Sequence, residues 1–258
     1  SALARKDILV DFLGFHCPVS ICCRYRDSNF NAGEAYADAI RFRLCSAHRK
    51  LVDIATTETN ITLRWPVISE EYFEYVDILE AASAYVNEVL YSAANYSLRP
   101  FTVIDIGSGY GHWTFAAHKA VTQIALRRGV KTPIEYRYLL VDVVNTEDLV
   151  HYLAELNGIE IDGKNGQLMF RLGFVTASGS FEEFGHGSSN YAQRMIQWYS
   201  PAWKTPAQSQ DLTAVSLEQL MALQDVPCVV DLMDIDIQGG EYALLMANAT
   251  IAVLTRHV

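Results

Sequence analysis

The chain has 258 residues, half of them hydrophobic, which is enough to form a sizeable core in one large domain or in one domain with an appendage. Acidic residues outnumber basic ones by 30 to 20, and no patch rich in Lys or Arg stands out, which argues against nucleic acid or an anionic membrane surface as the main partner. No segment contains the roughly 18 apolar residues that a membrane span needs, so we expect no membrane insertion.

The cysteines and the N-terminus bear on cellular location. Five cysteines make an odd count in a chain too large to need cross-links, which fits a reducing compartment better than a disulfide framework. The first residues lack the basic region and unbroken apolar run of a signal peptide, so a cytoplasmic location is expected. His16 and the nearby Cys17, Cys22 and Cys23 match no standard metal-site spacing, and we expect no metal there.

Residues 1–98 are predicted to form a mainly helical N-terminal region that serves as a cap or contributes to the substrate side. "ILVDFLGF" and "VSICC" are apolar enough to be short strands or buried pieces of helix. Apolar residues at a spacing near 3.6 predict a helix that begins near Ala32. A second helix is predicted over 69–94, because Ser69 is a good N-cap and acidic residues occupy the first turn.

Strands and helices alternate along residues 99–258, which we expect to be one domain. The predicted strands cover residues 101–106, 135–144, 166–178 and 228–237. The predicted helices cover residues 111–129, 145–159, 216–224 and 239–257. This alternation predicts an α/β fold with a Rossmann-like, mostly parallel sheet, helices on both faces and a ligand crevice at the carboxyl ends of the strands. The segment 179–210 is irregular, and residues 186–204 within it are interpreted as a substrate loop, with a partner surface or a mobile cover as alternatives.

The stretch "VIDIGSGYGHWT" joins the first of these strands to its helix through a glycine turn. Glycine tolerates positive φ and lets a ligand approach the backbone, and the free N–H groups of a helix start attract anions. The spacing is G-x-G-x-G instead of the dinucleotide pattern G-x-G-x-x-G, and Asp105 just ahead would repel a pyrophosphate but attract an ammonium group. S-adenosylmethionine carries both an ammonium and a carboxylate, so we predict that it binds here, with NAD or a purely structural turn as alternatives.

The same region resembles the class I S-adenosylmethionine-dependent methyltransferases. "VIDIGSGYGHWT" resembles their first motif and "LLVDVV" their second, with Asp142 where a carboxylate grips the ribose. "VVDLMDIDIQGGEYALL", with "AVSLEQL" upstream, resembles the FkbM-type family, and the resemblance covers residues 101–258. Two positions depart from that family: Val143 replaces a frequent proline after the second acid, and Asp234 stands where lysine or histidine is common.

The resemblance implies an enzyme that methylates a hydroxyl group of a small molecule, such as a sugar or a secondary metabolite. The residues implied at the methionine end of the cofactor are Asp105, Gly107, Ser108, Gly109 and Gly111. The residues implied near the ribose and the adenine are Asp142, Thr176, Ala177 and Ser178. Asp236 is implied beside the sulfonium and Glu241 on the following helix.

A hydroxyl nucleophile needs a proton acceptor, for which Asp236 is the first candidate and Glu241 the second. Asp236 has the alternative role of ordering the following Gly-Gly turn, and Glu241 that of a helix N-terminal charge. Asp234 and Asp236 share a strand face at period two, so a Mg²⁺ site is a further alternative, although we expect no metal.

Two other functions stay open at this point, an NAD-dependent oxidoreductase and an inactive cofactor-binding scaffold that recruits a protein. A methyltransferase sheet normally continues beyond the fourth helix. The domain is therefore expected either to be truncated or to complete its sheet with strands from the first hundred residues. An unpaired edge strand would favour association into a homo-oligomer.

Overall fold

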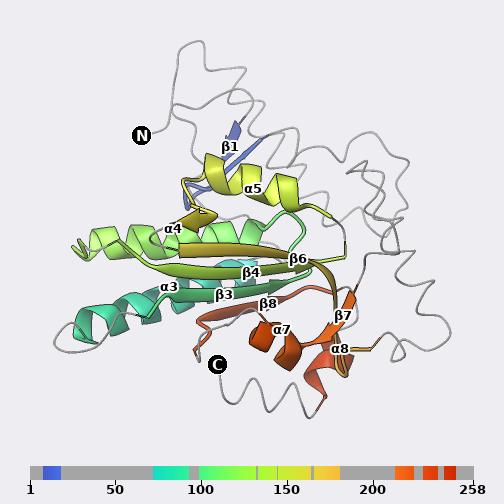
Figure 1. The fold of residues 1–258 in the computed structure, drawn as a ribbon. Helices are drawn as coiled ribbons and strands as arrows, with labels where there is room; N and C mark the ends of the chain where they lie inside the picture. Colours follow the sequence, from blue (N-terminus) through green and yellow to red (C-terminus); the bar gives the residue numbers. More distant parts are fainter. Residues whose placement is uncertain are drawn as a thin grey trace. The chain divides into compact units, whose positions relative to one another are not determined.

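The computed structural model describes residues 8–18, 72–92, 99–131, 133–143, 145–163, 166–180, 213–223, 229–237 and 241–247 (Figure 1). The chain divides into two compact units, Ser1–Glu80 and Ala81–Val258. The boundary falls inside helix α3 (Tyr72–Ser92), and the predicted N-cap Ser69 lies outside the described residues. The predicted helix from Ala32, most of the irregular segment 179–210 and most of the last predicted helix lie outside the described residues.

The described part of the first unit contains a small hairpin. Strand β1 (Ile8–Val10) pairs antiparallel with β2 (His16–Pro18). The turn between them is held by the Asp11 carboxylate, whose Oδ1 accepts hydrogen bonds from the N–H groups of Leu13 and Phe15 at 2.9 and 2.8 Å. The start of "ILVDFLGF" therefore forms a strand, which is one of the two structures expected for it. The stretch "VSICC" lies outside the described residues.

One expectation about the cysteines is corrected by this hairpin. Cys17 in β2 is disulfide-bonded, whereas the odd cysteine count fits a reducing compartment better than a disulfide framework. Disulfides persist in oxidising compartments and are rare in the cytosol. The cysteine count therefore gives no support to a cytoplasmic location. No helix in the described residues combines the length and the apolar character required to cross a membrane.

The larger unit is a mixed α/β structure built on a mostly parallel sheet, as the alternating pattern predicted. Four parallel strands lie in the order β6-β4-β3-β8. Their bounds are β3 (Phe101–Ile106), β4 (Tyr136–Asp142), β6 (Gly166–Thr176) and β8 (Leu232–Ile235). The short β5 (Asp162–Gly163) pairs antiparallel with the start of β6, and β7 (Thr213–Ser216) pairs parallel with its end.

Helices lie on both faces of this sheet. They are α4 (His112–Arg127), α5 (Glu147–Leu156), α7 (Leu217–Leu223) and α8 (Glu241–Leu245). Figure 1 shows α5 on one side of the strands and α7 and α8 on the other. Residues of β3 alternate between the faces: Asp105 bonds to α4, whereas Ile104 and Ile106 pack with Leu217 and Leu244 in one apolar cluster.

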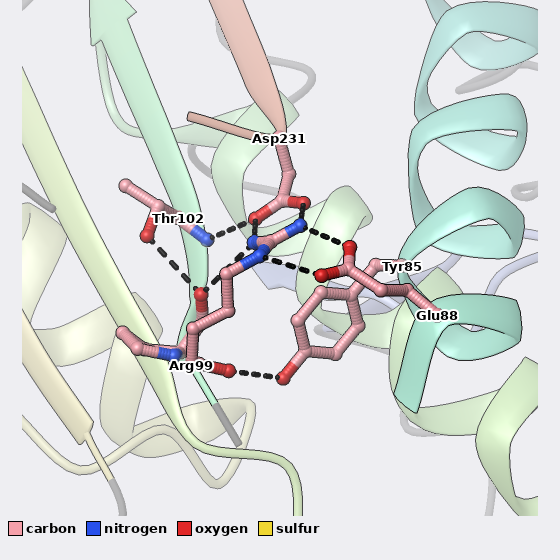
Figure 2. A network of polar contacts seen from close by, with 6 residues as sticks. Tyr85, Glu88, Arg99, Thr102 and Asp231 are labelled. Carbon is pink, nitrogen blue, oxygen red and sulfur yellow. Dashed lines mark hydrogen bonds and ion pairs between the residues drawn. The ribbon is translucent and has the colours of Figure 1, made fainter. Parts of the chain in front are cut away.

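An ion-pair network ties α3, β3 and β8 together at the amino ends of the strands (Figure 2). The Arg99 guanidinium donates to both carboxylate oxygens of Asp231 at 2.7 and 2.8 Å and also to Glu88 of α3 at 2.7 Å. The side chain of Asp231 is 6% exposed and also accepts the N–H of Thr102. Bidentate pairs of this kind are among the stronger charge-assisted contacts, so Asp231 fixes where β8 begins beside β3.

The substitution Asp231→Asn should lower the free energy of unfolding by about 2–4 kcal/mol, because it leaves a partly buried guanidinium without its main carboxylate. Urea unfolding measures this loss. Glu88→Gln is the matched control: it removes the other carboxylate, which is 52% exposed, and should cost no more than about 1 kcal/mol. Equal losses in the two variants would contradict the anchoring role of Asp231.

A polar and aromatic cluster lies between α4 and the amino half of β4. His118 Nδ1 is 2.9 Å from the Tyr138 hydroxyl oxygen, and the Tyr136 and Tyr138 rings stack at 4.9 Å. The Tyr136 hydroxyl donates to the carbonyl of Glu160 and accepts its N–H. Burial, reinforced by nearby Lys119, lowers the pKa of His118 to about 4 from its ordinary 6.5.

A lowered folded-state pKa means that the unfolded chain binds the extra proton first, so His118 stabilises the fold above pH 6.5 and this stability is lost as the pH falls towards 4. The loss should reach about 3 kcal/mol at most. Comparing urea unfolding of the wild type with His118→Gln across this range isolates the effect, because glutamine keeps a polar partner for Tyr138 and does not titrate. If the free energy of unfolding changed with pH in the same way in both proteins, the proposed role of His118 would be refuted.

Candidate functional site

The strand order reverses at the carboxyl end of β3. The chain passes from β3 to β4 and on to β6 in one direction, whereas β8 lies on the opposite side of β3. In open α/β sheets, the point where the strand order reverses is where ligands bind, outside the carboxyl ends of the strands. The glycine turn, residues 107–111, follows β3 at this point and leads directly into α4.

The glycines of this turn all have positive φ, but they are required for different reasons. A Cβ on Gly107 would lie 1.8 Å from the carbonyl oxygen of Asp236, and a Cβ on Gly111 would lie 2.7 Å from Leu140. A Cβ on Gly109 would have no described heavy atom within 4 Å. Packing therefore dictates Gly107 and Gly111, while the space beside Gly109 is open among the described residues.

Hydrogen bonds hold the turn against β4 and the start of α5. The N–H groups of Gly107 and Ser108 donate to the Val141 carbonyl at 2.8 and 3.1 Å. Gly109 is bound on both sides, because its N–H donates to Asp142 Oδ2 at 2.7 Å and its carbonyl accepts the Thr146 hydroxyl at 2.6 Å. The structure thus brings Asp142 beside the glycine turn.

Thr146 is a residue of the site that the sequence analysis missed. It is buried and is the N-cap of α5, yet its hydroxyl makes no capping bond and reaches the glycine turn instead. A threonine at a predicted helix start suggests a cap from sequence alone. Only the fold shows that its side chain serves a different partner.

Asp105 is fully buried, and its side chain points to α4. Its Oδ2 accepts the Thr114 hydroxyl at 2.8 Å, and its Oδ1 has no hydrogen-bond partner within the described residues. The parallel register places Asp105 directly opposite Asp234 of β8. Burial, followed by the charges of Asp234 and Asp142, raises the pKa of Asp105 well above its ordinary value, although the Thr114 hydrogen bond opposes this.

Both candidate proton acceptors follow the end of β8. Asp236 follows β8 directly, its side chain is exposed, and its N–H donates to the Ile106 carbonyl at 2.8 Å. Glu241 is the first residue of α8, and its Oε1 accepts the N–H of Ile237 at 2.8 Å. This hydrogen bond joins the first residue of α8 to the residue that follows Asp236.

The residues expected near the adenine follow an unusually long third strand. Leu172 of β6 pairs with Asp142, but β6 continues to Thr176, with its last four residues paired to β7. Ala177 and Ser178 come after this extension, the first half-buried and the second exposed. Ala177 and Ser178 therefore lie well beyond Leu172, the residue of β6 that pairs with Asp142 beside the glycine turn.

Two further observations concern the chemistry available near the glycine turn. The described residues contain no group of three or more His, Cys, Asp or Glu side chains arranged to hold a metal ion, and this includes the neighbourhood of Asp234 and Asp236. Helix α4 begins at Gly111 without a side-chain cap and without an acid in its first turn. Its first N–H groups and its dipole therefore favour an anionic group at this end.

Comparison with known proteins identifies no relatives, because no family model, no curated protein and no solved structure matches the chain.

Alanine substitutions should separate the glycines by their effect on stability. Gly107→Ala should cost more than about 3 kcal/mol, because the new Cβ collides with the backbone of Asp236 in addition to the cost of positive φ. Gly109→Ala should cost about 1–2 kcal/mol, as should Gly129→Ala, the matched control with positive φ and an open Cβ position. Thermal or urea unfolding measures all three, and a cost for Gly109→Ala similar to that for Gly107→Ala would contradict an open approach at this position.

Proposed function

We propose that the chain is an S-adenosylmethionine-dependent methyltransferase that acts on a hydroxyl group of a small-molecule acceptor. One observation carries the proposal: a glycine turn with a single open position lies where the strand order reverses, between Asp142 of β4 and Asp236 after β8. We also propose that the sheet is Rossmann-like. The order β6-β4-β3-β8 supports it, because nucleotide-binding sheets of this class place their third, second, first and fourth strands in that sequence.

The charges around the turn favour this cofactor over a dinucleotide. The uncapped start of α4 suits the carboxylate of the methionine part. Asp142 and Asp236 suit its positive groups and the ribose hydroxyls, whereas a pyrophosphate at the same place would meet several carboxylates. NAD is therefore the less favoured ligand and a suitable control in a binding experiment.

In the proposed reaction, the bound cofactor supplies a methyl group already activated by the sulfonium. The protein then has to align the acceptor oxygen with that methyl group, a contribution that can reach about 7–11 kcal/mol in favourable cases. The acceptor hydroxyl loses a proton as it attacks, and Asp236, an exposed residue directly after β8, is the first candidate to accept it. Glu241 is the second candidate, and its carboxylate accepts the Ile237 N–H.

Isothermal titration calorimetry should detect binding of S-adenosylmethionine and S-adenosylhomocysteine and no binding of NAD. Gly109→Ala should weaken the affinity for either ligand at least tenfold, because the added methyl group occupies the approach to the turn. Gly129→Ala should leave the affinity unchanged, since that residue follows α4 at its far end. Binding of NAD in place of the adenosyl ligands, or equal effects of the two alanines, would contradict the proposal.

Binding without methyl transfer to any hydroxyl acceptor would instead favour the inactive scaffold. Incubation with methyl-labelled S-adenosylmethionine and a panel of sugars and small hydroxylated metabolites distinguishes the two outcomes. Asp236→Asn is the matched variant in that assay, because it keeps the shape of the side chain and removes its ability to accept a proton.

A further inference from the structure

Gly109 is held by two side chains that come from the end of β4 and the start of α5. Its N–H donates to Asp142 Oδ2 at 2.7 Å, and its carbonyl accepts the Thr146 hydroxyl at 2.6 Å. Asp142 is the last residue of β4, and Thr146 is the residue directly before α5. The two hydrogen bonds therefore fix the two peptide groups on either side of the Gly109 Cα.

The bond from Thr146 also sets the direction of the next N–H group. The peptide between Gly109 and Tyr110 is planar and trans, so its C=O and its N–H point in opposite directions. Because the carbonyl is directed at Thr146, the Tyr110 N–H is directed away from α5. Gly109 has a φ of 55°, and glycine also permits many other backbone conformations. The turn therefore depends on hydrogen bonds from outside to keep this one conformation.

Thr146 gives up its usual role to make this contact. A threonine at an N-cap normally accepts an N–H of the first helical turn with its side-chain oxygen, which stabilises the helix. The carbonyl of Thr146 does accept the Val150 N–H at 2.8 Å, but its hydroxyl makes no capping bond and donates to the glycine turn. Proteins break a local rule of this kind mainly at functional sites. The departure therefore points to a role for the Thr146 hydroxyl in the site.

We propose that Thr146 is a positioning residue, whose hydroxyl holds the Gly109 peptide in the conformation that the ligand meets. This inference rests on the proposed function, since the ligand is taken to be S-adenosylmethionine. Thr146 is 3% exposed and acts through Gly109. A turn that is already ordered in the free protein spares the ligand the cost of ordering it, which increases the affinity.

Two substitutions at this position separate the hydroxyl from the shape of the side chain. Thr146→Val keeps nearly the same shape without a donor, and it should weaken binding of S-adenosylhomocysteine about three- to tenfold in calorimetric titration. Thr146→Ser keeps the donor and should restore most of the affinity. Thr146→Ala, which adds no bulk, takes the place of the valine variant if that variant does not fold.

Thr102→Val is the matched control for loss of a buried threonine hydroxyl. Thr102 is 1% exposed, and its hydroxyl also donates to a backbone carbonyl, that of Pro100, at 3.2 Å. It lies at the amino end of β3, the end remote from the glycine turn. Thr102→Val should therefore leave the affinity for the ligand unchanged.

Amide hydrogen exchange in the free protein tests the same role without a ligand. Loss of the Thr146 hydroxyl should let the turn open more often, so the Gly109 N–H should exchange about three- to tenfold faster in Thr146→Val. Its exchange should be unchanged in Thr102→Val and close to that of the wild type in Thr146→Ser.

The outcomes distinguish this inference from the proposed function. If the wild type binds the adenosyl ligand and Thr146→Val binds it equally well, or if Thr102→Val weakens binding to the same extent, the positioning role is overturned and the proposed function stands. Unchanged exchange of the Gly109 N–H in Thr146→Val also overturns the positioning role. If the wild type binds no adenosyl ligand, the proposed function fails, and the exchange rates still decide whether Thr146 holds the turn.

Discussion

Strand β3 is hydrogen-bonded along both edges in parallel register, and this constraint positions the groups of the candidate site. At its carboxyl end, pairing with β8 sets Asp105 opposite Asp234 and brings the backbone of Asp236 against Gly107. Pairing with β4 places Val141 and Asp142 where they accept the N–H groups of the turn. A shift of one residue in either register would move these side chains to the other face of the sheet.

The amino end of the same strand explains how this register is maintained. Thr102 and Asp231 exchange backbone and side-chain hydrogen bonds, and Arg99 joins Asp231 to Glu88 of α3. The strong ion pair thus lies at the end of β3 remote from the glycine turn, where it fixes the start of β8 without competing for a ligand. The carboxyl end, in contrast, brings Asp142 and Asp234 close enough to Asp105 to raise its pKa, together with its burial.

The candidate site was predicted in outline because its signals are local. The alternation of apolar strands with amphipathic helices predicted the α/β fold, and a strand, an acid and closely spaced glycines predicted the turn into α4. The acid after the second strand was likewise readable, and the structure brings Asp142 to the turn. These features depend on residues adjacent in the chain, so their spacing in the sequence reports them directly.

Tertiary structure decided which distant residues meet. It paired Asp105 with Asp234, tied Glu241 to the Ile237 N–H, and extended β6 beyond the level of Asp142. It also showed that Asp231, one of three aspartates in "DLMDID", belongs to an ion pair at the opposite end of the strand from Asp236. By itself the sequence determined the elements and the residue types at their ends, because these depend on local periodicity and backbone geometry. The partners of each acid and its burial were decided only by the fold, because they depend on strand order and register between segments far apart in the chain. The raised pKa of Asp105 follows from that burial and from its neighbours.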